Sequence, residues 1–540
     1  MKPPLVSRRL VLAVTCLVSL TGVGQAAEEP TLELPKYTVT TGRELPTPES
    51  WHYARIDDIE ILSSASSAVS QSMANGLQDF IFALDIIWPG VRRDFGAPCV
   101  VVVCGRFGEF ERFQPDTPVD FGLTERFSVT RGSTQASIVL DQTIILQPID
   151  VLHRNYVNVL LSGLARKPAP WLTEGLARLI AAVHLTENSI SIGQVIDPNG
   201  LSQVGGDFNV MLQSGALLPL AEFFSRTSST TLIADSRDSR WAAQCFAFVH
   251  WGLYGDYGKH QKEFLTFIRR LDQDPLTEAL FKECFKQDYR EMQQSLRNHV
   301  DFTRFKIAGV RAGKGEKISW PPAVELRDAT QAEVGRLQAA AFTLAGRPGA
   351  ARDALLMAYL RGERDPALLA ALGEAEANGG DHAKARKLLE AADAAKVVRP
   401  RAYVELARLR LEAARTKPEA AAGKLSTKQT ADVLEPLFTA RSQSQALPET
   451  YELIAATWAA SISSPAPAHL AVLDEGVRLF PRDAALVYAD AALQAKAGQF
   501  AAAGSLIRLG LRITTSDDMR AKFELLQAAL PAPPPAQPQP

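Results

Sequence analysis

The pattern of apolar and polar positions divides the chain into two unlike parts. Before about residue 310, short runs with the alternation or β-branched content of strands are mixed with helical periods. After about residue 330, the period is helical throughout and alanine is abundant. We therefore predict an α+β domain over residues 51–310, a linker over 311–330 and an all-α region over 331–530.

The clearest strand signal in the first part is the β-branched run Pro98–Cys104, which predicts a fully buried strand. Apolar residues at helical spacing over 69–84 predict a helix that Pro89 ends, with Ser63 and Ser64 as candidate N-caps. The aromatic residues of Trp241–Tyr257 are expected to be core. The other expected strands are Ile56–Ser63, Phe127–Arg131, Ala136–Leu146 and a hairpin within His184–Val195, and the other expected helices are Arg106–Phe113, Leu217–Ser225, Arg240–Gly255, Tyr257–Leu271, Pro275–Phe285 and Tyr289–Phe305.

The second part contains an internal repeat. Gly346 and Gly380 each lie in a turn between two expected helices and are 34 residues apart, which is the tetratricopeptide period, and Gly498 fits the same position in a later unit. Helix pairs of this kind bury their apolar stripes against the next pair. We predict a tetratricopeptide-like superhelix, with an irregular helical bundle as the alternative. Units are expected to begin near Gln331, Pro366, Pro400, Thr450 and Ala484, with an insertion at Lys417–Gln429 and a final helix at Asp517–Leu530.

The two ends of the chain have compositions of their own. Lys2, Arg8 and Arg9 precede the apolar run Leu10–Gly24, which is too short for a permanent membrane anchor, and small residues follow it. Residues 1–26 are therefore expected to be a signal peptide, and the protein to be exported to the periplasm or the cell exterior; the Sec and Tat routes both stay open. Residues 27–50 are expected to form a flexible arm and residues 531–540 a proline-rich tail.

Charge and cysteine content narrow the possible partners. The formal net charge is −2, and it becomes −5 when the three cationic residues of the leader are removed. Such a balance argues against nucleic acid or an anionic membrane as the main partner. No later segment reaches transmembrane length. The cysteines outside the leader show no C-x-x-C spacing and are expected to be buried free thiols, with the first two on opposite faces of one strand: Cys99, Cys104, Cys245 and Cys284.

The candidate chemistry is concentrated in Leu152–Ile180. An expected helix is followed by a proline-containing connection and a second helix that begins with the heptapeptide WLTEGLA, Trp171–Ala177. This stretch resembles the gluzincin-type, peptidase MA-like domains of secreted bacterial proteins, in which a helix with H-E-x-x-H precedes W-L-x-E-G-L-A. The resemblance implies a metallopeptidase-like α+β fold for residues 51–310. It places the two histidines, the general base and the third zinc ligand of the family at Arg154, Asn158, Asn155 and Glu174.

Three of these four positions have lost the residue that the chemistry needs. Histidines at i and i+4 can hold one zinc ion, and the neighbouring glutamate takes a proton from the metal-bound water. Arg154 stays protonated and cannot bind zinc, and Asn155 cannot act as a base. Only Glu174 retains its residue type. We therefore expect no catalytic residue, no bound metal and no cofactor, with zinc as the alternative.

Two questions about this stretch stay open at the level of sequence. A register shifted by one residue would place His153 at the first histidine position, but the other motif residues would still be missing. A metal site could then form only if the fold brought His153 close to His184, His250 and His260. Glu174 could form a buried ion pair with Arg154, or it could lie at a helix N-terminus, where the helix dipole favours an acidic group.

The combined hypothesis is an exported, inactive metallopeptidase-like protein whose repeat domain binds a protein or a peptide. The degenerate cleft could also hold an extended peptide beside an edge strand. The rival hypothesis is an active zinc metallopeptidase with non-standard ligands. A non-metal hydrolase is less favoured, because no Ser-His-Asp or Cys-His pattern is evident.

Overall fold

The computed structural model describes most of the chain outside its two ends. The expected signal peptide at 1–26 and all but the first residue of the expected tail at 531–540 lie outside the described residues. Within the described residues, no helix combines the length and apolar character that a membrane span requires. The described residues are 33–37, 45–90, 92, 98–115, 127–131, 135–143, 148–162, 169–192, 217–226, 236–271, 274–302, 308–420, 423–443 and 446–531.

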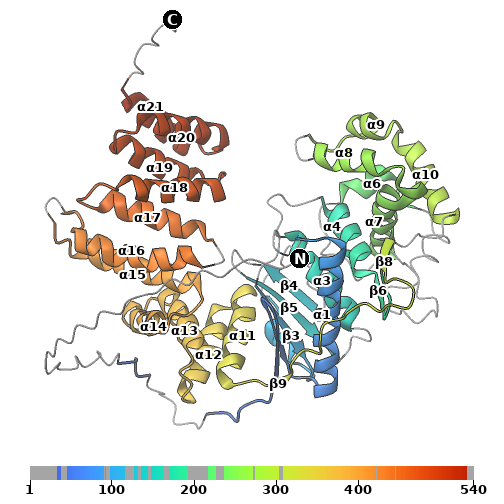
Figure 1. The fold of residues 1–540 in the computed structure, drawn as a ribbon, viewed down its shortest axis with the longest axis horizontal. Helices are drawn as coiled ribbons and strands as arrows, with labels where there is room; N and C mark the ends of the chain where they lie inside the picture. The colour runs from blue at the N-terminus through green and yellow to red at the C-terminus, as the bar shows by residue number, and fades with distance from the viewer. Residues whose placement is uncertain are drawn as a thin grey trace, which may run out of the picture.

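A mixed sheet lies at the centre of the molecule, with the strand order β4-β5-β3-β2-β1-β9 (Figure 1). Strand β3 pairs in parallel with β2 and β5, whereas the other neighbours are antiparallel. The expected α+β architecture of the first part is thus present at the level of mixed α and β structure. The strands are β1 (His52–Ile56), β2 (Ile59–Ser63), β3 (Cys99–Cys104), β4 (Phe127–Arg131), β5 (Ala136–Asp141) and β9 (Arg327–Asp328).

The single strand expected at Ile56–Ser63 is wrong in its extent. The chain turns at Asp57, which has a φ of 50°, and forms the antiparallel hairpin β1–β2 instead. Aspartate favours turns because its short side chain can bond to the nearby backbone and because it tolerates a left-handed backbone. The helix that follows, α1 (Ser67–Ile87), is capped by the side chain of Ser66 rather than by Ser63 or Ser64, because the hairpin keeps the chain extended to Ser63.

Helices cover both faces of the sheet, which explains why β3 is apolar at every position. Val101 and Val103 face α1 and α3 (Pro148–Ser162), whereas Val100 and Val102 face α11 (Gln331–Leu344), since successive side chains of a strand point to opposite faces. Figure 1 shows α1 and α3 on one side of the sheet and α11 on the other. The first repeat helix therefore completes the core of the sheet.

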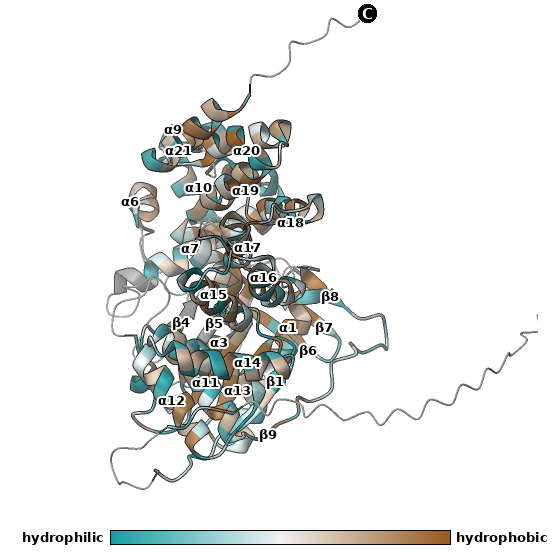
Figure 2. Ribbon diagram, turned by 90° about the vertical axis from the view of Figure 1, so that its left-hand side faces the viewer, coloured by the Kyte–Doolittle hydropathy of each residue, from teal (hydrophilic) through white to brown (hydrophobic). Residues whose placement is uncertain are grey.

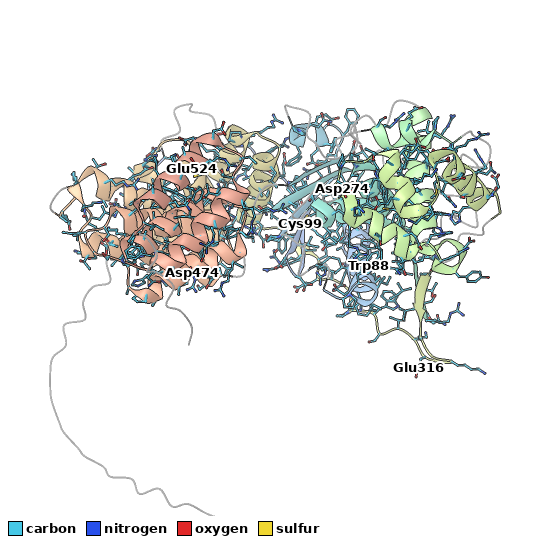
Figure 3. The ribbon with its side chains drawn as sticks, turned by 90° about the horizontal axis from the view of Figure 1, so that it is seen from above. Trp88, Cys99, Asp274, Glu316, Asp474 and Glu524 are labelled. Carbon is cyan, nitrogen blue, oxygen red and sulfur yellow. The ribbon has the colours of Figure 1, made fainter. Side chains whose placement is uncertain are left out.

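The four described cysteines are free thiols, as predicted; Cys99, Cys104 and Cys245 are buried as expected, whereas Cys284 is only partly buried. Cys99 and Cys104 lie at the two ends of β3 and belong to the cores on opposite faces of the sheet. Figure 3 shows Cys99 between the helical array, where Asp474 lies, and the aromatic-rich helices, where Asp274 lies.

The remaining helices of the first part surround an aromatic core. Trp241, Phe248 and Trp251 are buried there, as predicted, but Tyr257 is 88% exposed, because the chain leaves its helix at Tyr254 and turns with a positive φ at Tyr257. A three-stranded sheet lies beside this core. The elements are α4 (Pro170–Ala181), α6 (Leu220–Ser225), α7 (Ser236–Tyr254), α8 (Gln261–Leu271), α9 (Glu278–Phe285), α10 (Tyr289–Phe302), the short 3₁₀ turns Phe110–Phe113 and Gly255–Gly258, and strands β6 (Val183–Thr186), β7 (Ser189–Ile192) and β8 (Ala308–Arg311).

The second part is a succession of helices from α11 to the C-terminal end of the described chain, which fits a helical repeat superhelix (Figure 1). The glycine turns at Gly346, Gly380 and Gly498 all have positive φ. Most of these helices carry both hydrophilic and hydrophobic residues in Figure 2, as expected for helices with one buried face. They are α12 (Pro348–Leu360), α13 (Pro366–Asn378), α14 (His382–Ala394), α15 (Pro400–Thr416), α16 (Thr427–Ser442), α17 (Pro448–Ala460), α18 (Pro467–Leu479), α19 (Ala484–Lys496), α20 (Phe500–Ile513) and α21 (Asp517–Ala529).

The helix starts agree closely with the repeat units expected from the sequence. Helices begin at four of the five expected unit starts, Gln331, Pro366, Pro400 and Ala484, and the helix expected near Thr450 begins at Pro448. The expected insertion is the long connection between α15 and α16, although its last residues already belong to α16. The final expected helix is α21.

Residues 311–330 were expected to be a linker, but the backbone near both ends of this segment forms strands of the two sheets. Arg311 ends β8, and β9 adds to the edge of the large sheet beside β1. Arg336 of α11 donates two hydrogen bonds to Glu60 of β2, at 2.7 and 2.6 Å. The sequence pattern changes at 311–330, but the cores of the two parts are continuous.

Candidate functional site

Helices α3 and α4 position the residues of the peptidase-like stretch. The buried residues Tyr156, Val159 and Leu160 attach α3 to the core beneath the sheet. On α4, Trp171 is buried among aromatic rings of the second core. A Cβ atom at Gly175 would lie only 2.5 Å from the carbonyl oxygen of Cys245, so this glycine allows α4 to approach α7 closely.

Glu174, which the family resemblance places at the third ligand position, is buried and forms an ion pair. The Nε of Arg178, one helical turn later, donates a hydrogen bond to its Oε1. The exposed fraction of the two side chains is 8% for Glu174 and 16% for Arg178. A carboxylate at this depth is stabilised by a cationic partner, because burial without one is costly.

Arg154 lies in the same electrostatic environment. Burial, together with the neighbouring Arg178 guanidinium, lowers the pKa of Arg154 to about 10, and the Glu174 carboxylate opposes this change. The sequence hypothesis paired Glu174 with Arg154 alone; in the structure, one carboxylate is close to two guanidinium groups. The spacing of Glu174 and Arg178 at i and i+4 on a helix is the signal that could have revealed the additional partner.

The alternative role for Glu174 at a helix N-terminus is wrong. Helix α4 begins at Pro170, and its first turn contains no acidic residue. Glu174 lies beyond that turn, and the favourable effect of the helix dipole falls off within it. Its ion pair with Arg178 therefore accounts for its burial better than the dipole does.

The two asparagines of the degenerate motif differ in their surroundings. Asn155, which the resemblance places at the position of the general base, is fully buried, and neither polar atom of its side chain has a hydrogen-bond partner among the described residues. Asn158, at the position of the second histidine, is half-buried. An unsatisfied buried amide costs about 1–3 kcal/mol, so Asn155 is an unfavourable residue for stability at this position.

His153 has a structural role. Its ring stacks on Phe80 of α1, with 4.1 Å between the ring centroids, and its Nε2 lies 3.1 Å from the carbonyl oxygen of Gly76. Burial lowers the pKa of His153 to about 4, so the ring is neutral at physiological pH. These contacts direct His153 toward α1.

The other histidines that could have joined it lie in separate places. His184 is exposed on β6. The Nδ1 of His250 lies 3.2 Å from the Nε2 of His299 in the aromatic core, and His260 stacks on Trp251. Among the described residues, no group of three or more histidine, cysteine, aspartate or glutamate side chains is arranged to hold a metal ion.

The donor set at the degenerate motif does not fit zinc. A catalytic zinc site takes three protein ligands, and each must offer a lone pair. Glu174 is the only such group that the motif retains, and it is ion-paired with Arg178 beside a second guanidinium, Arg154. Two positive charges next to the one carboxylate oppose the entry of a divalent cation.

A second candidate site lies on the helical array, and sequence reasoning missed it. Two short pieces of the N-terminal arm, residues 33–37 and 45–50, contact the first repeat helices. The piece 46–49 borders a cavity of about 360 Å³ on α11 and α12. Arg361, which caps the C-terminus of α12, donates a hydrogen bond to the carbonyl oxygen of Pro46 at 2.7 Å. The arm was expected to be flexible, and local composition gave no sign of these contacts.

The described residues thus define a mixed α/β sheet domain whose core continues into a helical repeat array. No protein-family model matches the chain, and a search of curated proteins finds no match.

Proposed function

We propose that this chain is an exported, non-catalytic protein in which a metallopeptidase-like domain supports a tetratricopeptide-like array that binds a protein or a peptide. The observation that carries the loss of catalysis is the ion pair of Glu174 with Arg178, beside Arg154. On this proposal, Glu174 neutralises the buried guanidinium of Arg178 instead of binding zinc. A metal-dependent mechanism would need this carboxylate, two further ligands and a base.

The binding role is supported by the architecture of the second part. Arrays of helix pairs present extended surfaces that suit protein or peptide partners. Here the array already holds backbone of the arm, through hydrogen bonds from Arg361 and Tyr359 to carbonyl oxygens. Side chains that bind backbone carbonyls can accept an extended peptide with little regard for its sequence.

Metal analysis and peptidase assays on the purified chain test the catalytic part of this proposal. We expect zinc well below one equivalent and no cleavage that depends on Glu174. Stoichiometric zinc that is lost together with peptide cleavage in Glu174→Ala, but not in the matched surface variant Glu524→Ala, would overturn it. The mass of the secreted protein tests the export: removal of residues 1–26 is expected, and full-length protein retained in the cytoplasm contradicts it.

A further inference from the structure

Residues Glu33–Tyr37 of the arm, which form neither helix nor strand, lie against α12, α13 and α14, where the first dark-blue segment runs in Figure 1. The hydroxyl of Tyr37 donates a hydrogen bond to Oε1 of Glu376 at 3.0 Å. The hydroxyl of Tyr359 donates one to the carbonyl oxygen of Pro35 at 2.8 Å. Leu34 packs against the same apolar core as the repeat helices.

The surface that receives these residues, called the arm seat below, combines Arg352, Tyr359, Glu376 and Lys384. The rings of Tyr37 and Tyr359 meet edge to face with centroids 5.4 Å apart, and the Nζ of Lys384 lies 5.0 Å from the Tyr37 ring centroid. Edge-to-face pairs and ring–cation contacts are specific to aromatic ligands. The arm seat therefore selects an aromatic residue at this position.

Glu376 gives the arm seat its polar specificity. Its side chain is only 2% exposed, and Arg352 holds it with an N–O distance of 2.9 Å. One Glu376 oxygen thus forms an ion pair with Arg352 and accepts a hydrogen bond from the Tyr37 phenol. Burial and the Glu376 carboxylate both raise the pKa of Tyr37, so the phenol stays protonated and able to donate. A phenylalanine in place of Tyr37 would fill the same space but leave this hydrogen bond unmade.

Residues 33–37 make few contacts with the array, so this piece of the arm can exchange. Lys36 and Glu33 point to solvent, with side chains 90% and 75% exposed. Within the piece 33–37, the residues that engage the array are Leu34, Pro35 and Tyr37. An untethered segment held by three residues binds weakly, whereas a tether of a few residues supplies an effective concentration of about 1 mM.

We infer that the arm seat is a recognition site for peptide segments with the pattern leucine–proline–any residue–tyrosine, and that the chain's own arm occupies it in cis. The inference rests on the proposed function of the array and deepens it, because it states the chemistry of the partner segment. A partner with this pattern must displace the arm, so the docked arm lowers the apparent affinity of the array for that partner.

The test uses a fluorescent peptide with the sequence of residues 31–39 and measures its anisotropy with the full chain. The variant Tyr37→Ala weakens the docking of the arm and leaves the arm seat intact. If the tethered arm fills the arm seat about nine-tenths of the time, the peptide will bind this variant about tenfold more tightly than the original chain. Replacing tyrosine by alanine in the peptide should abolish binding.

Variants of the arm seat complete the design. In the Tyr37→Ala chain, Glu376→Gln and, separately, Tyr359→Phe should each weaken peptide binding about tenfold, whereas the surface control Glu524→Gln should not. Tyr359→Phe removes only one hydroxyl, so it keeps the test valid if Glu376→Gln reduces folding, which circular dichroism would reveal.

The results separate this inference from the proposed function. Equal peptide affinity for the original chain and Tyr37→Ala, or no binding to either, overturns the inference and leaves the metal and peptidase results untouched. A dimer of the original chain that Tyr37→Ala dissociates also overturns it, because the arm would then occupy a second copy. Tighter binding to Tyr37→Ala that Tyr359→Phe reverses supports it.

Discussion

The buried ion pair of α4 gives the sharpest test of how the degenerate motif is stabilised. Replacing Glu174 by leucine leaves the guanidinium of Arg178 buried without its carboxylate, and Arg154 loses the same nearby negative charge. Removing one partner of a buried pair typically costs about 3–5 kcal/mol. Because Arg178 keeps 16% of its side chain exposed, we expect a loss in free energy of unfolding of about 3 kcal/mol, at the lower end of that range.

The matched comparison is the double variant Glu174→Leu with Arg178→Met. Replacing a whole buried pair by apolar residues is often neutral or stabilising, so the double variant should recover about 1–3 kcal/mol of the loss. Part of the loss remains, because Arg154 stays charged. Urea unfolding followed by tryptophan fluorescence is a suitable assay, since Trp171 lies on the same helix.

Two results would refute this reasoning. The first is a double variant as unstable as Glu174→Leu, because the buried charge of Arg178 would then not be the cause. The second is an original chain that a chelator destabilises as much as Glu174→Leu does, because Glu174 would then be serving a metal. The exposed pair of Asp518 and Lys522 is the control, and Asp518→Ala should leave unfolding unchanged.

Three further predictions concern packing and pH. Gly175→Ala should destabilise the chain by about 1–3 kcal/mol, because the added Cβ would lie 2.5 Å from the Cys245 carbonyl oxygen, whereas Gly349→Ala, with open space around it, should not. Burial and, to a smaller extent, the neighbouring His250 lower the pKa of His299 to about 4. The unfolded chain therefore binds more protons at this residue than the folded chain does, and the free energy of unfolding should decrease as the pH is lowered from about 6.5 to 4. The variant His299→Gln should remove part of this decrease. Burial raises the pKa of Asp490 to about 7. The folded chain therefore binds more protons at this residue than the unfolded chain does, and the free energy of unfolding should decrease as the pH rises from about 4 to 7. At pH 8, the variant Asp490→Asn should be more stable than the original chain.

Denaturant midpoints measured across pH check these three predictions. Equal midpoints for Gly175→Ala and Gly349→Ala would mean that α4 and α7 do not approach as closely as described. Two results would show that these groups titrate in the folded chain as they do in the unfolded chain. One is a His299→Gln variant whose stability decreases at low pH as much as that of the original chain. The other is an Asp490→Asn variant that is less stable than the original chain at pH 8.

The sequence by itself determined the features that depend on local spacing. The β-branched run of β3, the starts of the repeat helices at Pro366 and Pro400, and the glycine turn at Gly380 all follow from neighbouring residues, because helix and strand periods and turn chemistry act over a few positions. Residue identity alone also shows that Asn155 cannot act as a general base, since an amide cannot take up the proton.

Only the tertiary structure decided which groups meet. The sequence could not show that α11 covers the second face of the sheet, that Arg154 and Arg178 are both near Glu174, or that Tyr37 docks on Glu376. These contacts join residues far apart in the chain, apart from the Glu174–Arg178 pair on one helix. Their formation depends on how whole elements pack, because burial and charge pairing are satisfied in three dimensions and leave little trace in local sequence.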